Sequence, residues 1–244
     1  MRRFLFNKKT CSILFLLFWT TSISMIASGC RILQMAVPPS LQGQSLTLPI
    51  KRSIWTNEMD FGAYRVRNVQ LGWTETHRVG GWIAKHVASS QRFRFSLQKG
   101  NEVIWENKCL VTRNKDVVKF RGPIRLKLTT QQKDSLHCAF SPNQESAFFW
   151  ELDLYQDYPQ PSQGRLHSND TRFRVKASHK VQGSEDPIFW LAGYTFESQG
   201  RVLGAVDALT EGVVWLDRGL PQQQQDALAS TSVALLLQQK LFSH

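Results

Sequence analysis

The segment ALASTSVALLL, residues 227–237, limits the possible folds more than any other feature, because it is a helix-like stretch without a polar face. The surrounding residues 221–242 begin with Pro221, which suits the first position of a helix, and continue with good helix formers. The apolar stretch is shorter than the about 20 residues that a helix needs to cross a bilayer. A helix without a polar face is normally buried on all sides. We therefore expect a helix at 221–242 that the rest of the chain encloses.

Strand-like patterns dominate the chain before this helix. The runs are rich in Val, Ile, Phe, Trp and Thr, many of them alternate, and turn residues such as Lys99-Gly100-Asn101 separate them. They predict strands at 45–51, 62–72, 92–98, 102–112, 117–129, 135–141, 147–156, 171–179, 189–197, 201–208 and 212–216. Short connections favour antiparallel pairing. The expected fold is mainly β, an antiparallel barrel or sandwich of about eleven strands with one buried apolar C-terminal helix, forming a single domain over 45–244.

The first thirty residues differ in composition from the rest. A basic stretch without acids, MRRFLFNKKT, precedes the apolar run 12–27, and the small residues Ser28 and Gly29 lead into Cys30. This arrangement resembles the lipobox of bacterial lipoproteins, in which the peptide is cut before the cysteine and acyl chains are attached to it. The resemblance implies a signal peptide at 1–29, lipidation of Cys30 and attachment to a membrane. An uncleaved signal anchor and a secreted protein with an incidental cysteine are the alternatives.

The residues after Cys30 bear on location. In Gram-negative lipoproteins an aspartate directly after the cysteine retains the protein in the inner membrane. Arg31 stands there in this chain, so the resemblance implies the outer membrane, with the protein facing the periplasm. Residues 30–44 contain Pro38-Pro39 and little periodicity, and we expect them to be a lipidated N-terminus and a short tether.

Two cysteines remain once Cys11 has left with the leader and Cys30 has been acylated. Cys109 and Cys138 form an even pair in an oxidising compartment, which predicts a disulfide, although two buried free thiols are the alternative. A metal site is disfavoured because His137 is the one close additional ligand.

The C-terminal part also resembles a known fold. An apolar helix follows a series of strands and the sequence GYTFESQGRVLGAVDALTEGVVWLDR, residues 193–218. The combination resembles the tubby-like C-terminal barrel over roughly residues 45–242. In that fold a closed antiparallel barrel of about a dozen strands encloses a hydrophobic C-terminal helix, which implies the same architecture here. A disulfide and a lipid anchor are not features of the eukaryotic members, and a sandwich with a packed helix is the alternative.

Residues that would indicate catalysis are missing from the sequence. It contains neither HExxH nor GxSxG, and the glycines at 200 and 204 lack the lysine of a phosphate loop. Glu151 and Asp153 share one face of a predicted strand, which is typical of an ordinary solvent face. Asp207 interrupts an apolar run, and we expect it to accept hydrogen bonds from turn amides. The chain is therefore expected to have no enzymatic activity, metal or cofactor.

The clearest surface pattern is positive. In RNKDVVKFRGPIRLKL all basic residues fall on odd positions, and Val118, Phe120, Ile124, Leu126 and Leu128 fall on even ones, which predicts a ladder of cations on one face. The ladder consists of Arg113, Lys115, Lys119, Arg121, Arg125 and Lys127. Arg65 with Arg67, and Arg92 with Arg94, repeat the alternation. The ladder indicates either a solvated outer face that resists aggregation or a binding surface for an anionic partner.

These features lead to one functional hypothesis and one rival. We expect a non-enzymatic envelope lipoprotein that binds an anionic lipid or a protein partner through basic residues. Nucleic acid is excluded as a partner by the exported location rather than by the charge. The rival is a carrier of lipid or another small molecule that uses a barrel mouth lined with tryptophans.

Overall fold

The computed structural model describes residues 33–241 apart from residues 54, 82–83, 121–125 and 143–148. The predicted signal peptide and Cys30 lie outside the described residues, and so do Arg121 and Arg125 of the predicted ladder. Among the described residues, no helix is both long enough and apolar enough to cross a membrane.

The described strands form one antiparallel sheet of 14 strands. In chain order the elements are η1 (Pro39–Leu41), β1 (Ser45–Pro49), β2 (Lys51–Arg52), β3 (Met59–Phe61), β4 (Tyr64–Leu71), β5 (Glu75–Gly80), β6 (Ala84–Lys99), β7 (Glu102–Phe120), β8 (Leu126–Pro142), β9 (Trp150–Asp157), β10 (Gln163–His167), β11 (Arg172–Ser178), β12 (Gly193–Ser198), β13 (Arg201–Asp207), β14 (Val213–Asp217) and α2 (Gln222–Leu241). From β6 to β14, each strand pairs with the strand that follows it in the sequence. Short connections favour this pairing.

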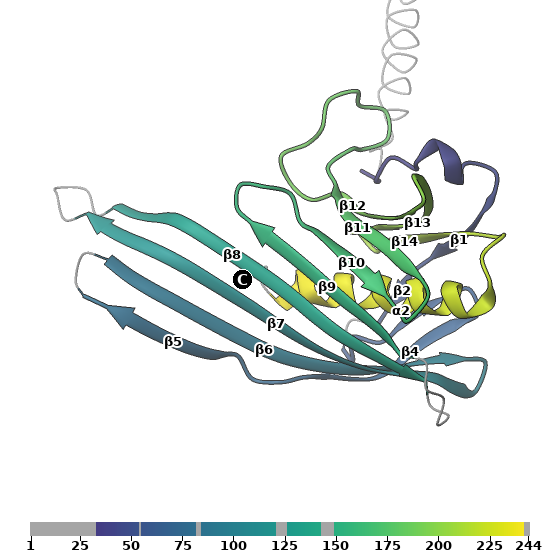
Figure 1. The fold of residues 1–244 in the computed structure, drawn as a ribbon, viewed down its shortest axis with the longest axis horizontal. Helices are drawn as coiled ribbons and strands as arrows, with labels where there is room; N and C mark the ends of the chain where they lie inside the picture. Colours follow the sequence, from purple (N-terminus) through teal and green to yellow (C-terminus); the bar gives the residue numbers. More distant parts are fainter. Residues whose placement is uncertain (1–32, 54, 82–83, 121–125, 143–148, 242–244) are drawn as a thin grey trace, which may run out of the picture. The chain divides into compact units, whose positions relative to one another are not determined.

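The sheet curls into a nearly closed barrel. β1 pairs with β14, β2 pairs with β3, and Ile50 alone separates β1 from β2, so the segment 45–52 connects both ends of the sheet. Figure 1 shows the strands curving around α2. The predicted fold class is confirmed, with 14 strands instead of about eleven.

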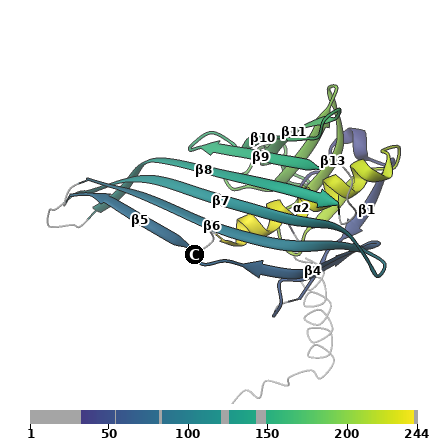
Figure 2. The ribbon, with the colours of Figure 1, turned by 60° about the horizontal axis from the view of Figure 1, so that its bottom comes forward.

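Helix α2 fills the barrel (Figures 1 and 2). Every residue from 227 to 237 is buried, as expected for a helix without a polar face. The inward-facing side chains of the strands complete this core, and the largest among them include Phe61, Phe95, Phe140, Phe173 and Phe196. The helix therefore occupies the space in which a wider barrel would hold a ligand.

A small polar cluster attaches the first turns of α2 to the wall. The Tyr64 hydroxyl donates a hydrogen bond to Asp226 Oδ1 at 2.7 Å, and Gln222 Nε2 donates to the same oxygen at 2.7 Å. Lys99 Nζ lies 3.9 Å from that oxygen. Burial, followed by the hydrogen bond and the charge of Asp226, raises the pKa of Tyr64 well above its usual value. The phenol therefore stays protonated and keeps donating.

Three strands are longer than the barrel requires. β6, β7 and β8 continue past the barrel wall and, together with β5, form a projecting four-stranded sheet on the left of Figure 1. We call this sheet the extension; it consists of β5 with residues 84–91, 111–120 and 126–135. All six residues of β5 are exposed.

The disulfide is present as predicted. Cys109 and Cys138 are directly opposite partners in β7 and β8, with an S–S distance of 2.02 Å. Both residues are buried on the core side of the sheet. The bond therefore joins β7 to β8 at the base of the extension.

The segment expected to be a tether packs on the barrel instead. Met35 forms a bridge with Val181, and both belong to a second buried cluster together with Leu41 and Trp215. The tether prediction was wrong for residues 33–44 because the apolar side chains of Met35 and Leu41 cover the outer side of the sheet. The packed part of the chain therefore begins before residue 45.

Candidate functional site

Two residues of the predicted ladder, Arg113 and Lys115, lie on the inner side of the sheet. Cys109 and Val111 face the core, and because side chains alternate along a strand, Arg113 and Lys115 follow on the same side. The solvated outer face considered for them is therefore wrong for these two residues. The backbone register pairs Lys119 with Lys127. The remaining two members, Arg121 and Arg125, lie outside the described residues.

Neighbouring strands add two cations that the sequence pattern did not reveal. Arg78 of β5 is opposite Val87, which is opposite Lys115, so Arg78 and Lys115 share a row across the sheet. Lys85 of β6 is opposite Val117, one row further from the barrel. We call Arg78, Lys85, Arg113 and Lys115 the basic inner face. This grouping depends on strand register, which alternation in one strand does not give.

One carboxylate belongs to the same face. Asp134 accepts hydrogen bonds from Arg113 Nε at 3.1 Å and from Arg113 Nη2 at 2.8 Å. Gln132 Nε2 donates to Asp134 Oδ2 at 3.0 Å. The pair is nearly enclosed, since the Asp134 side chain is 7% exposed. The forked contact fixes the guanidinium in one position.

A cavity of about 370 Å³ lies where the basic inner face meets the C-terminal end of α2. Its lining includes Arg113, Asp134, Gln238 and, from the loop 179–192, Phe189 and Trp190. This size falls in the range of small-molecule sites, which combine aromatic walls with a few polar groups. The arrangement offers hydrogen-bond donors and acceptors inside and aromatic rings at its edge.

The aromatic edge is unusually exposed. Phe189 is 84% exposed and Trp190 is 58% exposed. His179 Nδ1 lies 2.9 Å from the carbonyl oxygen of Trp190, which ties the tryptophan to the end of β11. Tyr194 also lines the cavity, and burial raises its pKa to about 12, so that side chain is neutral.

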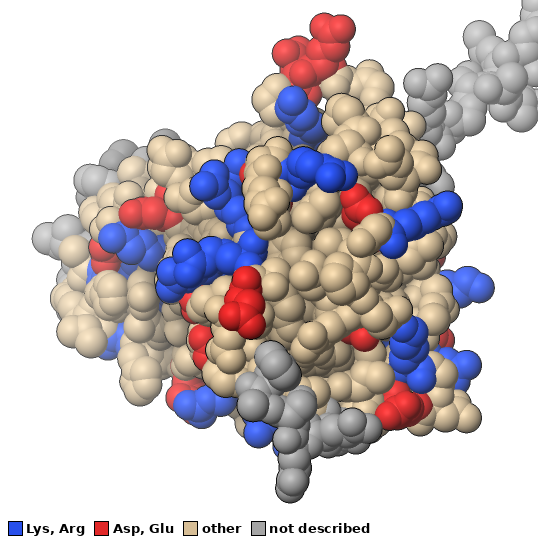
Figure 3. Space-filling model, turned by 45° about the vertical axis from the view of Figure 1, so that its right-hand side comes forward, with Lys and Arg blue, Asp and Glu red and all other residues tan. Residues whose placement is uncertain are grey.

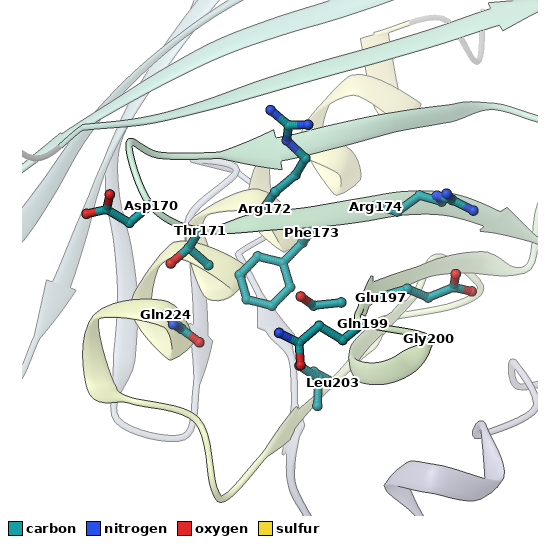
Figure 4. A pocket seen from close by; sticks show the side chains of 11 residues that line it. Asp170, Thr171, Arg172, Phe173, Arg174, Glu197, Gln199, Gly200, Leu203 and Gln224 are labelled. Carbon is teal, nitrogen blue, oxygen red and sulfur yellow. The ribbon is translucent and has the colours of Figure 1, made fainter.

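A larger cavity of about 760 Å³ lies at the other end of α2. The turns β10–β11 and β12–β13 and the first turn of the helix enclose it, as Figure 4 shows. The guanidinium groups of Arg172 and Arg174 are directed away from the space between Phe173, Gln199 and Gln224. Its centre therefore offers little charge for recognising an ion.

The carboxylates that invited a catalytic interpretation are part of the outer surface. Glu151 and Asp153 lie on the outer side of β9, as predicted, while its apolar residues face the core. Asp153 Oδ1 lies 2.8 Å from His137 Nδ1, and Arg165 Nε donates to Asp153 Oδ2 at 3.3 Å. Burial opposes ionisation of Asp153, but these hydrogen bonds outweigh it and lower its pKa. A carboxylate held in this form is a poor general acid.

Other charged groups are distributed without a comparable grouping. On the face shown in Figure 3, lysines and arginines are interspersed with acidic and neutral residues. Arg92 and Arg94 are exposed on the outer side of β6, as their alternation predicted. Within the part of the chain that the structure describes, no group of three or more His, Cys, Asp or Glu residues is placed to hold a metal ion.

Comparisons with protein-family models, with curated proteins and with solved structures give no match for this chain. The lipobox and the tubby-like relationship therefore stay predictions. The barrel around a helix is shown by the pairing of the strands and the burial of α2.

Proposed function

We propose that this chain is a lipid-anchored, non-enzymatic protein of the bacterial outer membrane, facing the periplasm, that binds an anionic lipid or protein partner. The lipobox-like sequence ending at Cys30 supports the anchor. The basic inner face supports the anionic partner. The tubby-like resemblance is consistent with the barrel architecture but adds no activity.

The grouping of four cations on the basic inner face carries the proposal. Among the described residues of the extension, Val111 and Val117 are the buried apolar ones, so burial of apolar surface accounts for little of this sheet. Asp134 is the single carboxylate among the described residues of that face, and it is paired with Arg113. An anionic ligand on this face would interact with several cations at once, and each cation contributes about 1 kcal/mol near an anionic lipid surface.

The rival, a carrier with its ligand inside the barrel, finds less support. Residues 227–237 of α2 are buried in the barrel and occupy its interior. A ligand in the cavity beside Phe189 and Trp190, at the mouth of the barrel, is compatible with binding at the basic inner face, because Arg113 belongs to both. The test therefore changes cations of the basic inner face.

The test compares two double variants that remove equal charge. Arg78→Gln with Lys85→Gln neutralises half of the basic inner face, whereas Arg172→Gln with Arg174→Gln removes two exposed arginines from the outer side of β11. The acylated protein in zwitterionic nanodiscs is titrated with short-chain phosphatidylglycerol by calorimetry, with short-chain phosphatidylcholine as the neutral ligand. We expect the inner-face variant to weaken binding of phosphatidylglycerol by roughly tenfold or more, from about 1 kcal/mol per cation.

The outer-face variant is expected to bind as the unchanged protein does. Equal affinities for the two variants, or equal affinity for the two lipids, would remove the basic inner face from the proposal. Detection of an unacylated chain by intact mass would remove the anchor.

A further inference from the structure

The loop 179–192 lies directly beside the N-terminal segment. The amide of Ala36 donates to the carbonyl oxygen of Lys180 at 3.0 Å, and the amide of Gln182 donates to that of Gln34 at 2.9 Å. Together with the bridge between Met35 and Val181, these contacts pair the two segments as short antiparallel neighbours. A lipid attached at Cys30 would therefore be separated from this loop by only a short stretch of chain.

The distance available is short. Leu33, the first described residue, is three positions after Cys30, and an extended chain of that length spans at most about 11 Å. A long flexible linker would leave the barrel free to turn in any direction. With the docked segment 33–44, an acylated Cys30 holds one particular side of the barrel next to the membrane.

That side carries the aromatic pair Phe189 and Trp190. The preceding residue, Ile188, packs against the cluster that contains Met35, and its amide donates to the carbonyl oxygen of His179 at 2.7 Å. The backbone of the pair is thus attached to the same cluster as the N-terminal segment, while its rings face solvent. Aromatic side chains are enriched at the boundary between lipid and water, because their rings suit that layer.

The basic inner face begins at the same place. Arg113 lines one cavity with Phe189 and Trp190, and Lys115 follows two residues further along β7, about 7 Å away. Rings at the depth of the lipid interface would leave these cations near the phosphates of the headgroups. Glu185 and Asp186 are exposed in the same loop and oppose an anionic leaflet, so the contact of the loop itself depends on the rings.

We infer that the loop 179–192 is a membrane contact, which places Phe189 and Trp190 in the lipid interface beside the acylated Cys30 and turns the basic inner face toward anionic phospholipid headgroups. The inference rests on the proposed lipid anchor and narrows the anionic partner to the membrane itself. A bilayer contact beside a covalent lipid adds a second attachment and restricts the orientation of the protein.

The test uses a fluorescent label that reports on its surroundings. Phe189→Cys places the label in the aromatic pair, and Asn169→Cys places it in the exposed turn between β10 and β11, next to Asp170 of the cavity at the other end of α2. Cys109 and Cys138 are joined in a disulfide, and acylation would occupy Cys30, so the introduced cysteine is the free thiol of the processed protein. The labelled acylated proteins are reconstituted into vesicles of phosphatidylethanolamine and phosphatidylglycerol.

We expect the emission of the label at 189 to shift to shorter wavelength on vesicles and to be quenched by brominated lipids, while the label at 169 keeps its emission in water. The label at 189 could instead keep its emission in water on a protein that carries acyl mass and floats with the vesicles. This result would overturn the membrane contact and leave the lipoprotein proposal intact. Equal shifts at both positions would overturn the orientation. A chain without acyl mass that does not float with the vesicles would overturn the proposed anchor and this inference together.

Discussion

At the scale of single residues, Asp207 connects the barrel to the N-terminal segment. Its Oδ1 accepts a hydrogen bond from the amide of Leu209 at 2.7 Å, and its Oδ2 accepts one from the amide of Met35 at 3.1 Å. The expected contact with turn amides is confirmed, and the contact with Met35 was not foreseen. Burial raises the pKa of Asp207, although both amides act in the opposite direction.

The raised pKa of Asp207 predicts a specific pH dependence. The folded protein binds this proton more tightly than the unfolded chain, so the residue's contribution to stability falls as the pH rises through about 4, the ordinary pKa of aspartate, toward the raised value. In Asp207→Asn this titration is absent, so we expect its free energy of unfolding, relative to that of the unchanged protein, to increase as the pH rises above about 4. An asparagine accepts from one of the two amides only, which costs about 1–2 kcal/mol overall.

Urea unfolding of both proteins at several pH values measures these quantities. Parallel curves for Asp207→Asn and the unchanged protein would show that the carboxyl titrates alike in the folded and unfolded states.

Ser230 is a buried hydroxyl in the middle of α2. Thr231 and Ser232 donate to the carbonyl oxygens of Ala227 and Leu228, both at 2.8 Å, but Ser230 Oγ has no partner among the described residues. Replacing Ser230 by alanine removes an unsatisfied polar group and improves helix propensity, so we expect the free energy of unfolding to rise by about 1 kcal/mol. Chemical denaturation measures the change, with Ser232→Ala as the matched control, in which a satisfied hydroxyl is lost. A less stable Ser230→Ala protein would contradict the expectation.

At the scale of elements, the helix was predictable and the long strands were predictable only in part. The apolar stretch 227–237 alone requires enclosure, and the predicted helix 221–242 agrees with α2 within one residue at each end. The predicted strand 117–129 instead covers the end of β7 and the start of β8. Alternation breaks inside β7 because its inner side changes from the buried Val111 to Arg113, where the strand leaves the core.

Three strands were missed altogether, one because it has no apolar face and two because they are short. β5 has six exposed residues, so no alternation marks it, and β3 and β10 are three and five residues long. The basic inner face was half predictable for the same reason. The spacing of Arg113 and Lys115 is visible in one strand, but their grouping with Arg78 and Lys85 depends on register between strands.

The disulfide is expected to stabilise the extension more than the rest of the barrel. Cys109 and Cys138 close a loop with a sequence separation of 29 residues, which in the chain-entropy model stabilises by about 3 kcal/mol. We expect Cys109→Ala with Cys138→Ala to lower the free energy of unfolding by about that amount. Hydrogen exchange of amides in residues 111–118 should accelerate more than exchange in β12 and β13, because those strands lie elsewhere in the sheet. If hydrogen exchange accelerates equally in all of these strands, the disulfide stabilises the whole barrel and not the extension in particular.

At the scale of the whole molecule, the docked segment 33–44 connects the barrel's surface to the proposed anchor. The segment is attached at Met35 through Val181 and Asp207, and at Leu41 through the cluster with Trp215. With the proposed anchor, a barrel attached in this way would have one side close to the lipid. The aromatic pair and the cavity beside it would lie on that side, because the loop 179–192 contacts the same segment.

This connection can be lengthened without changing a single contact of the barrel. Inserting ten Gly and Ser residues between Ile32 and Leu33 adds a flexible linker with an average span of about 17 Å. Acylation and flotation with vesicles should be unchanged, because Cys30 and the leader are intact. We expect the fluorescence shift of a label at residue 189 to decrease, because the linker no longer holds the loop at the interface. Contact of the loop with the bilayer then has to offset the orientational freedom that the barrel loses on binding. A rigid spacer of similar length should lower the shift further, since it holds the loop away from the lipid. If the label at 189 shifts equally with and without the linker, the aromatic pair binds the bilayer by its own affinity, and the docked segment does not determine the orientation of the protein.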